Sequence, residues 1–197
     1  TYSDGINDLK SMAKACIDRG FEYLVITDHS QSAGYAGGLK IDVVYQQWEE
    51  IDTLNSTFNN FKILKGIESD ILSNGELDYP ADILAKFDVV IASIHSGMNM
   101  DELKATERLI SAISNPYMHI LGHPTGRLLL GRPGYPINHA KIIEACAEHQ
   151  VSIELNANPQ RLDLDYQWIK VAIENNVKLK NIKTDKIKEI SHKEINK

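Results

Sequence analysis

Histidine and carboxylate side chains stand at the ends of several apolar runs in this chain. His29, Glu68, His95 and His123 each close a separate run of this kind. Imidazole and carboxylate are the ligands that hold Zn²⁺, Mn²⁺ or Fe²⁺, and this mixture of nitrogen and oxygen suits such metals better than Ca²⁺. A lone histidine at a strand end is more often a hydrogen-bonded loop residue than a ligand. Four such ends together favour a metal-binding site.

Alternating strands and helices must bring these residues together. Six apolar runs predict strands over Tyr23–Ile26, Ile63–Glu68, Val89–His95, His119–His123, Val151–Leu155 and, more weakly, Val177–Ile182. Helical spacing predicts helices over Leu9–Ile17, Asp42–Phe58, Ala81–Phe87, Asp101–Ser114, Ile137–His149 and Leu164–Asn175. Strands that are apolar on both faces and separated by helices indicate a parallel sheet. Six such units favour a closed or nearly closed barrel, whose strand ends converge on one rim.

Composition limits the class of protein. With 197 residues, 43% hydrophobic and 24% charged, the chain is expected to form one globular domain. No apolar stretch approaches the roughly 20 residues of a membrane-spanning helix, so we expect a cytoplasmic protein without a membrane partner. Cys16 and Cys146 lie on apolar helix faces and have no CxxC partner, which predicts buried thiols. The net charge of −6 argues against nucleic-acid binding by bulk electrostatics and is compatible with carboxylates that bind cations.

Several segments, in order along the chain, carry a resemblance to a known family. These are Thr1–Gly5, Thr27–Ser30, Gly66–Ile71, Ser93–Ser96 and Gly122–Leu129, which resemble successive motifs of the PHP (polymerase and histidinol phosphatase) domain. Three more segments, Leu77–Pro80, Asn115–Pro116 and Asn156–Leu164, resemble the version found C-terminal to bacterial X-family DNA polymerases. The match runs from Thr1 to about Val177.

The resemblance implies an α/β fold, a distorted (β/α)₇ TIM-like barrel with a site for two or three Mn²⁺ or Zn²⁺ ions. It implies a metal-dependent hydrolase that cleaves phosphodiesters as a 3′→5′ exonuclease in DNA repair. The 3′ end of DNA would be the substrate, and a polymerase module would lie N-terminal in the full-length protein. By the same resemblance, the metal ligands and catalytic residues would be Asp4, His29, Glu68, His95 and His123.

The chain also departs from the family pattern. The family's His-x-His motif ends the first barrel strand, upstream of Thr1, so we expect residues 1–183 to form a PHP domain without that strand. The family's last motif is Asp-x-His, whereas here Asp185 is followed by Lys186 and Ile187. Asp185 could be a remnant ligand, and residues 184–197 are expected to form a divergent or frayed tail.

Other polar residues near the predicted rim leave their roles open. Arg127 and Arg161 could bind a substrate phosphate, or could be solvated or paired with Asp163. Asp70 could support a ligand or cap a loop. Asn156 and Asn158 could line the pocket or complete a turn.

Two alternatives to the nuclease stay open. One is a stand-alone phosphatase of the same fold, acting on a small phosphomonoester such as histidinol phosphate. The other is an inactive structural domain that supports a partner module, since the chain lacks three expected histidines.

Overall fold

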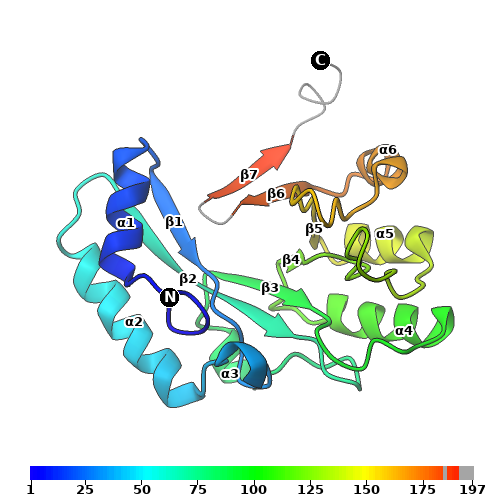
Figure 1. The fold of residues 1–197 in the computed structure, drawn as a ribbon, viewed down its shortest axis with the longest axis horizontal. Coiled ribbons are helices and arrows are strands. Elements are labelled where there is room, and N and C mark those ends of the chain that lie inside the picture. Colours follow the sequence, from blue (N-terminus) through cyan, green and yellow to red (C-terminus); the bar gives the residue numbers. More distant parts are fainter. Residues whose placement is uncertain (184–185, 191–197) are drawn as a thin grey trace.

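The fold is built from strands and helices that alternate along the chain (Figure 1). The computed structural model describes residues 1–183 and 186–190, and their side chains as far as residue 180. The elements are α1 (Leu9–Asp18), β1 (Tyr23–Ile26), the 3₁₀ turn η1 (Gly34–Ala36), α2 (Ile41–Asn55), β2 (Lys62–Asp70), α3 (Ala81–Leu84), β3 (Val89–Ser93), α4 (Glu102–Ile113), β4 (Ile120–Leu121), α5 (His139–Glu148), β5 (Ser152–Glu154), α6 (Tyr166–Glu174), β6 (Leu179–Lys183) and β7 (Lys186–Ile190). Each predicted helix and strand is found, with ends that differ by a few residues.

One sheet holds all seven strands in the order of the sequence. Strands β1 to β6 pair in parallel, and β7 pairs antiparallel with β6. The sheet curls, with the helices along its outer side, and β1 and β7 form its two edges (Figure 1). The fold is therefore the expected distorted TIM-like barrel in the form of a curled half-barrel, rather than a closed one.

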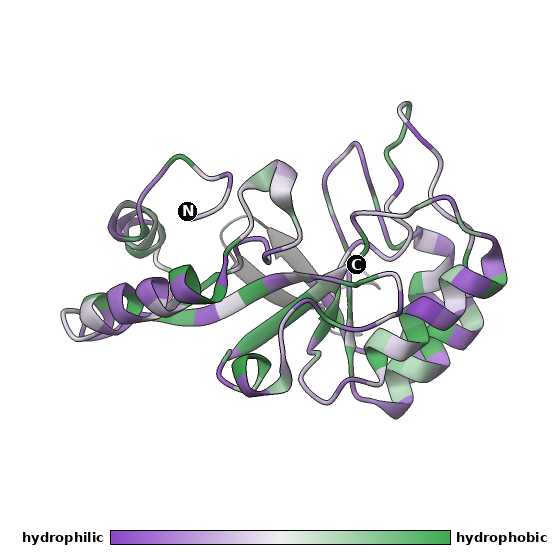
Figure 2. Ribbon diagram, turned by 90° about the horizontal axis from the view of Figure 1, so that it is seen from below, coloured by the Kyte–Doolittle hydropathy of each residue, from purple (hydrophilic) through white to green (hydrophobic). Residues whose placement is uncertain are grey.

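Apolar faces of the helices pack against the sheet and form the core. Helix α1 buries Leu9, Ala13 and Cys16, which recur at helical spacing, and α4 likewise buries Leu109 and Ile113. In Figure 2 the strands are largely hydrophobic, and the helices turn hydrophobic faces towards them. Both cysteines are buried thiols, as predicted.

Side-chain caps fix where the helices begin, and therefore where the loops of the rim end. The side chains of Asp8, Asp101, Asn138 and Asp165 each accept a hydrogen bond from a backbone N–H in the first turn of α1, α4, α5 and α6. Among the residues that the structure describes, no helix combines the length and apolar character needed to cross a membrane.

Candidate metal centre

The ends of β1 and β2 place His29 beside Glu68. The two residues form a parallel bridge beyond β1, in which Glu68 donates its N–H to the Asp28 carbonyl at 3.0 Å. Ser30 in turn donates its N–H to the Glu68 carbonyl at 3.0 Å. Because the backbone fixes this register, both side chains lie at the same end of the sheet.

The ends of β3 and β4 bring His95 and His123 to the same point. Ser93 pairs with Asp70 across β2 and β3, and His95 follows two residues later. Gly122 donates its N–H to the Ala92 carbonyl at 2.9 Å, just before His123. A Cβ at Gly122 would lie 2.3 Å from Ser93 Oγ, so a larger residue here would displace the hydroxyl of Ser93.

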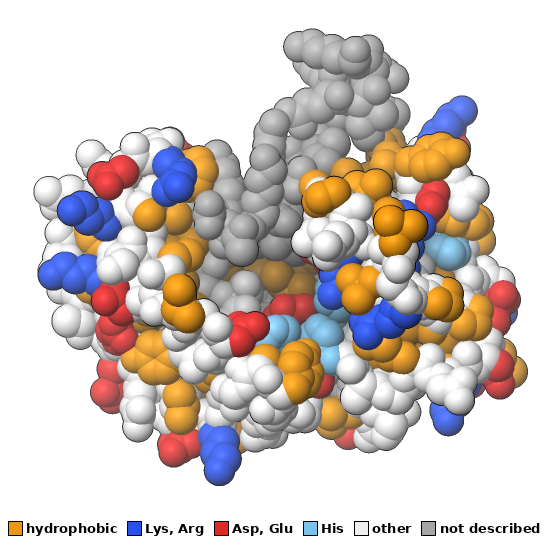
Figure 3. Space-filling view, viewed as in Figure 1, with side chains coloured by type: hydrophobic (Ala, Val, Ile, Leu, Met, Phe, Trp, Pro, Cys, Tyr) orange, Lys and Arg blue, Asp and Glu red, His pale blue; other side chains and the backbone are white. Residues whose placement is uncertain are grey.

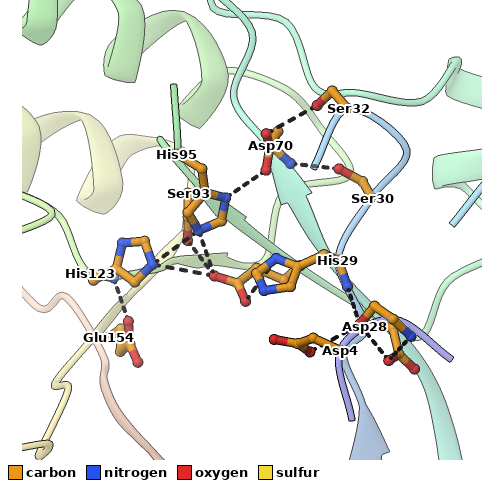
Figure 4. A network of polar contacts seen from close by, with 12 residues as sticks. Asp4, Asp28, His29, Ser30, Ser32, Asp70, Ser93, His95, His123 and Glu154 are labelled. Atoms are coloured by element: carbon orange, nitrogen blue, oxygen red, sulfur yellow. Dashed lines mark hydrogen bonds and ion pairs between the residues drawn. The ribbon is translucent and has the colours of Figure 1, made fainter. Parts of the chain in front are cut away.

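Glu68 lies within 4 Å of the rings of His29, His95 and His123, which Figure 4 labels, and so at the centre of a compact cluster. Its Oε1 atom is 3.3 Å from His95 Nε2 and 3.4 Å from His123 Nε2. The two Nε2 atoms are 3.3 Å apart, and Ser93 Oγ donates to Glu68 Oε1 at 3.0 Å. Two imidazole nitrogens and a carboxylate oxygen thus converge on one small volume, as ligands of a common ion would.

Asp70 and His29 extend this cluster on its other side. Asp70 Oδ1 is 2.6 Å from His95 Nδ1, and His29 Nδ1 is 3.7 Å from Glu68 Oε2. Two groups of candidate ligand atoms result, one from His29, Asp70 and His95 and one from Glu68, His95 and His123, each with its atoms within 4.8 Å of one another. His95 belongs to both groups, so two neighbouring cation positions are available.

Charges inside the cluster shift the ionisation of its members. Burial favours the neutral form of Glu68, but hydrogen bonds from His123 and His95 outweigh it and hold the pKa of this carboxyl well below its usual range. Burial also disfavours the charged form of His95, yet the hydrogen bonds to Asp70 and Glu68 outweigh it and raise its pKa to about 9. The two carboxylates therefore favour positive charge at this point, which a divalent cation would also supply.

An unpartnered ring nitrogen supports the fit to a metal. Within the described part of the chain, His29 Nδ1, which faces Glu68 Oε2 at 3.7 Å, is buried and has no hydrogen-bond partner. A buried polar atom without a partner is costly, and coordination of a cation is one way to satisfy it. The donor set, three imidazoles and two carboxylates, matches the ligands of Zn²⁺ and Mn²⁺.

The loop before α1 carries Asp4, the remaining predicted ligand in the described residues. Asp28 holds this loop, since its carboxylate accepts hydrogen bonds from the backbone N–H groups of Tyr2 and Ser3 and from the Gln47 amide. Asp4 itself is exposed and belongs to neither compact group of ligand atoms. Its role as a ligand therefore stays a prediction. Asp185 lies outside the described residues.

The two arginines differ in how they are engaged. Arg127 donates from Nε to the Arg161 carbonyl at 2.8 Å and from Nη2 to the Leu162 carbonyl, and its Nη1 pairs with Asp165 at 2.6 Å. The ion pair considered with Asp163 is instead made with Asp165. Arg161 makes one longer contact, from Nη1 to the Arg127 carbonyl at 3.5 Å. Substrate binding by either arginine remains a prediction.

The two asparagines after β5 serve the turn in which they lie. The Asn156 side chain donates to Glu154 Oε1 at 3.0 Å and accepts from the N–H of Asn158 at 3.0 Å. The Asn158 side chain accepts from the N–H of Gln160 at 2.9 Å. Of the two readings, these contacts match turn formation.

Two residues near the cluster were not predicted from the sequence. Glu154, at the end of β5, is buried, and its Oε2 accepts a hydrogen bond from the His123 N–H. Burial raises the pKa of Glu154. Tyr35 of η1 packs its ring 5.8 Å from the His29 ring and 6.2 Å from the His95 ring, with 71% of the residue exposed. The strand-end rule, by which polar residues at the ends of parallel strands meet on one rim, would have found Glu154. No sequence signal marks Tyr35.

The loop that carries Tyr35 is closely held. Leu39 donates its N–H to the His29 carbonyl at 2.9 Å, and a Cβ at Gly38 would lie 1.8 Å from the Ser30 carbonyl oxygen. Burial, and then the carboxylates of Asp70, Glu68 and Asp4, raise the pKa of Tyr35 to about 12, while the charge of Arg161 opposes them. Tyr35 therefore keeps a neutral hydroxyl at the mouth of the site.

Comparison with known proteins identifies related sequences. The family model for the PHP domain matches residues 1–158. A DNA polymerase/3′-5′ exonuclease PolX of Bacillus subtilis is 48% identical over 179 residues, which cover 91% of this chain and 31% of that protein. A probable phosphatase of Caldanaerobacter subterraneus subsp. tengcongensis is 34% identical over 154 residues, which cover 73% of this chain and 54% of that protein. The chain thus spans about a third and about half of these two relatives.

A solved structure has the same fold. It is histidinol phosphate phosphatase from Lactococcus lactis subsp. lactis, determined with zinc, L-histidinol and phosphate. The two structures superpose with a TM-score of 0.59 at 18% sequence identity, over 88% of this chain and 76% of that one.

Proposed function

The chain belongs to the PHP domain family, and from this premise we propose that its strand-end cluster is a metal-dependent phosphodiesterase centre. We propose further that it acts as a 3′→5′ exonuclease on DNA, in DNA repair, and that Mn²⁺ or Zn²⁺ is its cofactor. The observation that carries the proposal is the convergence of His95 Nε2 and His123 Nε2 on one oxygen of Glu68, at 3.3 and 3.4 Å.

His29, Glu68, Asp70, His95 and His123 are the residues that would hold the ions. Ions bound there would lower the pKa of a water molecule and neutralise charge on a phosphoryl oxygen. The protein itself supplies orientation, because Asp70 and Ser93 fix the His95 ring and the Glu68 carboxylate through hydrogen bonds of 2.6 and 3.0 Å.

Two side chains at the mouth are placed to contact substrate. Within the described chain, the Arg161 guanidinium makes no hydrogen bond beyond the 3.5 Å contact to Arg127. Its remaining N–H groups can therefore donate to a substrate phosphate. Tyr35 presents an exposed ring beside His29 and His95, against which a base or sugar can pack. We assign Arg127 to the support of the Arg161 loop rather than to direct contact, since its donors are already engaged.

The similarity to the B. subtilis protein favours DNA as substrate. That relative is both a DNA polymerase and a 3′-5′ exonuclease by name, and the chain corresponds to about a third of it. We therefore propose that the chain works beside an N-terminal polymerase module, in the cytoplasm.

A phosphatase is the second candidate. The relative from C. subterraneus is a probable phosphatase, and the solved structure with the same fold is a histidinol phosphate phosphatase. A compact site with one phosphate-binding arginine would also accept a phosphomonoester.

One assay separates these candidates. The full-length protein that contains this chain is incubated, without nucleotides, with 5′-labelled single-stranded DNA or with histidinol phosphate, in Mn²⁺ or in EDTA. We expect Mn²⁺-dependent shortening of the DNA from its 3′ end. Glu68→Gln should lower the rate by at least about 10- to 100-fold, because loss of a ligand costs no less than loss of its outer partner. Glu107→Gln, an exposed carboxylate on α4, is the matched control.

The other outcomes are equally informative. Release of phosphate from histidinol phosphate, with intact DNA, would replace the nuclease with the phosphatase. Failure of the full-length protein to bind Mn²⁺ or Zn²⁺ would instead indicate an inactive structural domain.

A further inference from the structure

Three leucines beside the metal centre project into solvent. Leu129, Leu130 and Leu162, here called the leucine ridge, are 40%, 110% and 48% exposed. Exposed apolar residues that gather on one surface mark an interaction site. The ridge lies on two loops, one between β4 and α5 and the other between β5 and α6.

The two loops form one connected unit. Leu129 donates its N–H to the Gln160 carbonyl at 2.6 Å, and Arg127 Nε donates to the Arg161 carbonyl at 2.8 Å. Leu128 and Arg132 exchange backbone hydrogen bonds of 3.0 and 2.9 Å across the tip of the first loop. The leucines are therefore held outward by ordered backbone.

The backbone at the ridge is strained. Leu130 has φ of 63° and Leu162 has φ of 46°, in the left-handed region that residues with a Cβ rarely adopt. Such conformations persist where the surrounding structure imposes them, and they concentrate at functional sites. Here the strain accompanies the exposure of two apolar side chains.

Position and charge indicate what binds there. The first loop leaves the metal centre directly, since Gly126 donates its N–H to the His123 carbonyl at 2.9 Å. Arg132 and Arg161, for which the described chain supplies no ion pair, flank the ridge in a chain whose net charge is −6. In Figure 3, apolar and cationic side chains gather beside the histidines, on the side of α5 and α6. A local cationic surface next to a phosphodiesterase centre suits a polyanion.

We propose that the leucine ridge is a wedge that engages the end of a DNA duplex, packing against the last base pair while the freed 3′ strand enters the metal centre. The proposal rests on the nuclease function proposed above. Proteins insert apolar side chains, leucine among them, between DNA bases to unstack them, and use arginines for the flanking phosphates. A base-paired 3′ end must be unpaired before it can reach the metal centre, and a wedge would promote this step.

A protein partner fits this surface less well. A module docked on the ridge would also cover Arg161 and the adjacent mouth of the cleft. The DNA end, by contrast, uses the leucines, the arginines and the cleft together.

The test compares paired and unpaired 3′ ends. The full-length protein degrades, with Mn²⁺ and without nucleotides, one labelled strand presented single-stranded, in a blunt duplex, or with a 3′-terminal mismatch. The variant is Leu129→Ser/Leu130→Ser, and the matched control is Leu103→Ser, which is 65% exposed on α4. Each protein is scored by the ratio of its blunt-duplex rate to its single-strand rate.

Opening one DNA base-pair step corresponds to about tenfold in an equilibrium constant. We expect the double variant to lower the ratio about tenfold, the mismatched end to recover most of that loss, and Leu103→Ser to keep the wild-type ratio. An unchanged ratio in the double variant overturns the wedge. Equal losses on all three DNAs, with a lower melting temperature, also overturn it and assign the ridge to packing within the full-length protein. If the wild type cleaves no DNA but hydrolyses histidinol phosphate, the nuclease function fails first, and the wedge with it.

Discussion

Asp70 orients the residue that both groups of candidate ligands share, because its Oδ1 atom holds His95 Nδ1 at 2.6 Å while His95 Nε2 faces Glu68. Ser32 Oγ donates to the second oxygen of Asp70 at 3.0 Å, and Ser30 Oγ accepts the Asp70 N–H at 2.8 Å. The carboxylate is thus fixed at both oxygens, and the backbone of Asp70 is held by Ser30. It can either orient the imidazole or bind an ion itself.

Asp70→Asn separates these two roles. If Asp70 orients His95, Mn²⁺ affinity should fall about 10- to 100-fold at unchanged stoichiometry, because the amide is a poorer partner for the ring. If Asp70 is a ligand, the number of bound ions should fall by one. Isothermal titration of Mn²⁺ into the full-length protein distinguishes the two, with Asp82→Asn, an exposed carboxylate on α3, as control. Unchanged affinity and stoichiometry would exclude both roles.

At the scale of residues, the strand-end rule explains what the sequence could predict. His29, Glu68, His95 and His123 lie together because parallel strands end at one rim, and each directly follows an apolar run. Tyr35 could not be found in this way, since its approach to His29 depends on the path of a loop. Local sequence does not encode such a path.

At the scale of elements, the β4–α5 and β5–α6 loops act as a pair. Arg127 spans them through Asp165 and the carbonyl groups of Arg161 and Leu162. Arg161 rests on this support and leaves most of its guanidinium to solvent or substrate. The sequence made both arginines candidates for substrate binding and left ion pairing open, because spacing alone cannot tell which one bonds to the neighbouring loop.

Alanine variants should separate support from contact. Arg161→Ala should weaken DNA binding and reduce the slope of log affinity against log salt by about 1, with an unchanged melting temperature. Arg127→Ala should lower the melting temperature, since it breaks a partly buried ion pair and two hydrogen bonds to carbonyl groups. Fluorescence anisotropy with labelled single-stranded DNA, over a salt series, and thermal unfolding measure the two effects. A lower melting temperature for Arg161→Ala alone would reverse the assignment.

Element boundaries show where sequence patterns have their limits. Periodicity located α1, α4 and α5 closely, because amphipathic helices repeat their buried positions many times. Strand β4 has two residues, and β7, which was not predicted, pairs antiparallel within a Lys-rich segment that has no clear apolar alternation. Hydrogen bonding to a neighbouring strand defines these strands, and the sequence of the segment alone does not show which strand lies beside it.

At the scale of the whole molecule, the net charge is negative whereas the surface beside the histidines is locally positive. The value of −6 argued against a bulk nucleic-acid surface, yet the rim beside the histidines gathers arginines from two loops. Composition averages over both, so only the fold can reveal a local cationic surface. The same fold concentrates carboxylates and imidazoles at the centre of the curled sheet, where a buried ring nitrogen without a partner is costly unless a cation coordinates it.

Cation binding should therefore stabilise the whole domain. A ligand that binds only the folded state, at 100 times its dissociation constant, adds about 2.7 kcal/mol of stability. For a domain of this size, that corresponds to a rise of roughly 5–10 °C in melting temperature. We expect Mn²⁺ or Zn²⁺ to raise the domain's transition by this amount over EDTA, and Ca²⁺ to raise it less, since imidazole is a poor calcium ligand. Differential scanning calorimetry of the full-length protein measures the shift.

Glu68→Gln is the informative control for this shift. It removes the carboxylate that His95 and His123 face while keeping its size, so the Mn²⁺-dependent rise should shrink to the part that the His29, Asp70 and His95 group supplies, whereas Glu107→Gln should retain the full rise. An undiminished rise in Glu68→Gln would locate the stabilising ion away from Glu68. It would also show that the cation stabilises the half-barrel without the contacts that Glu68 makes with His95 and His123.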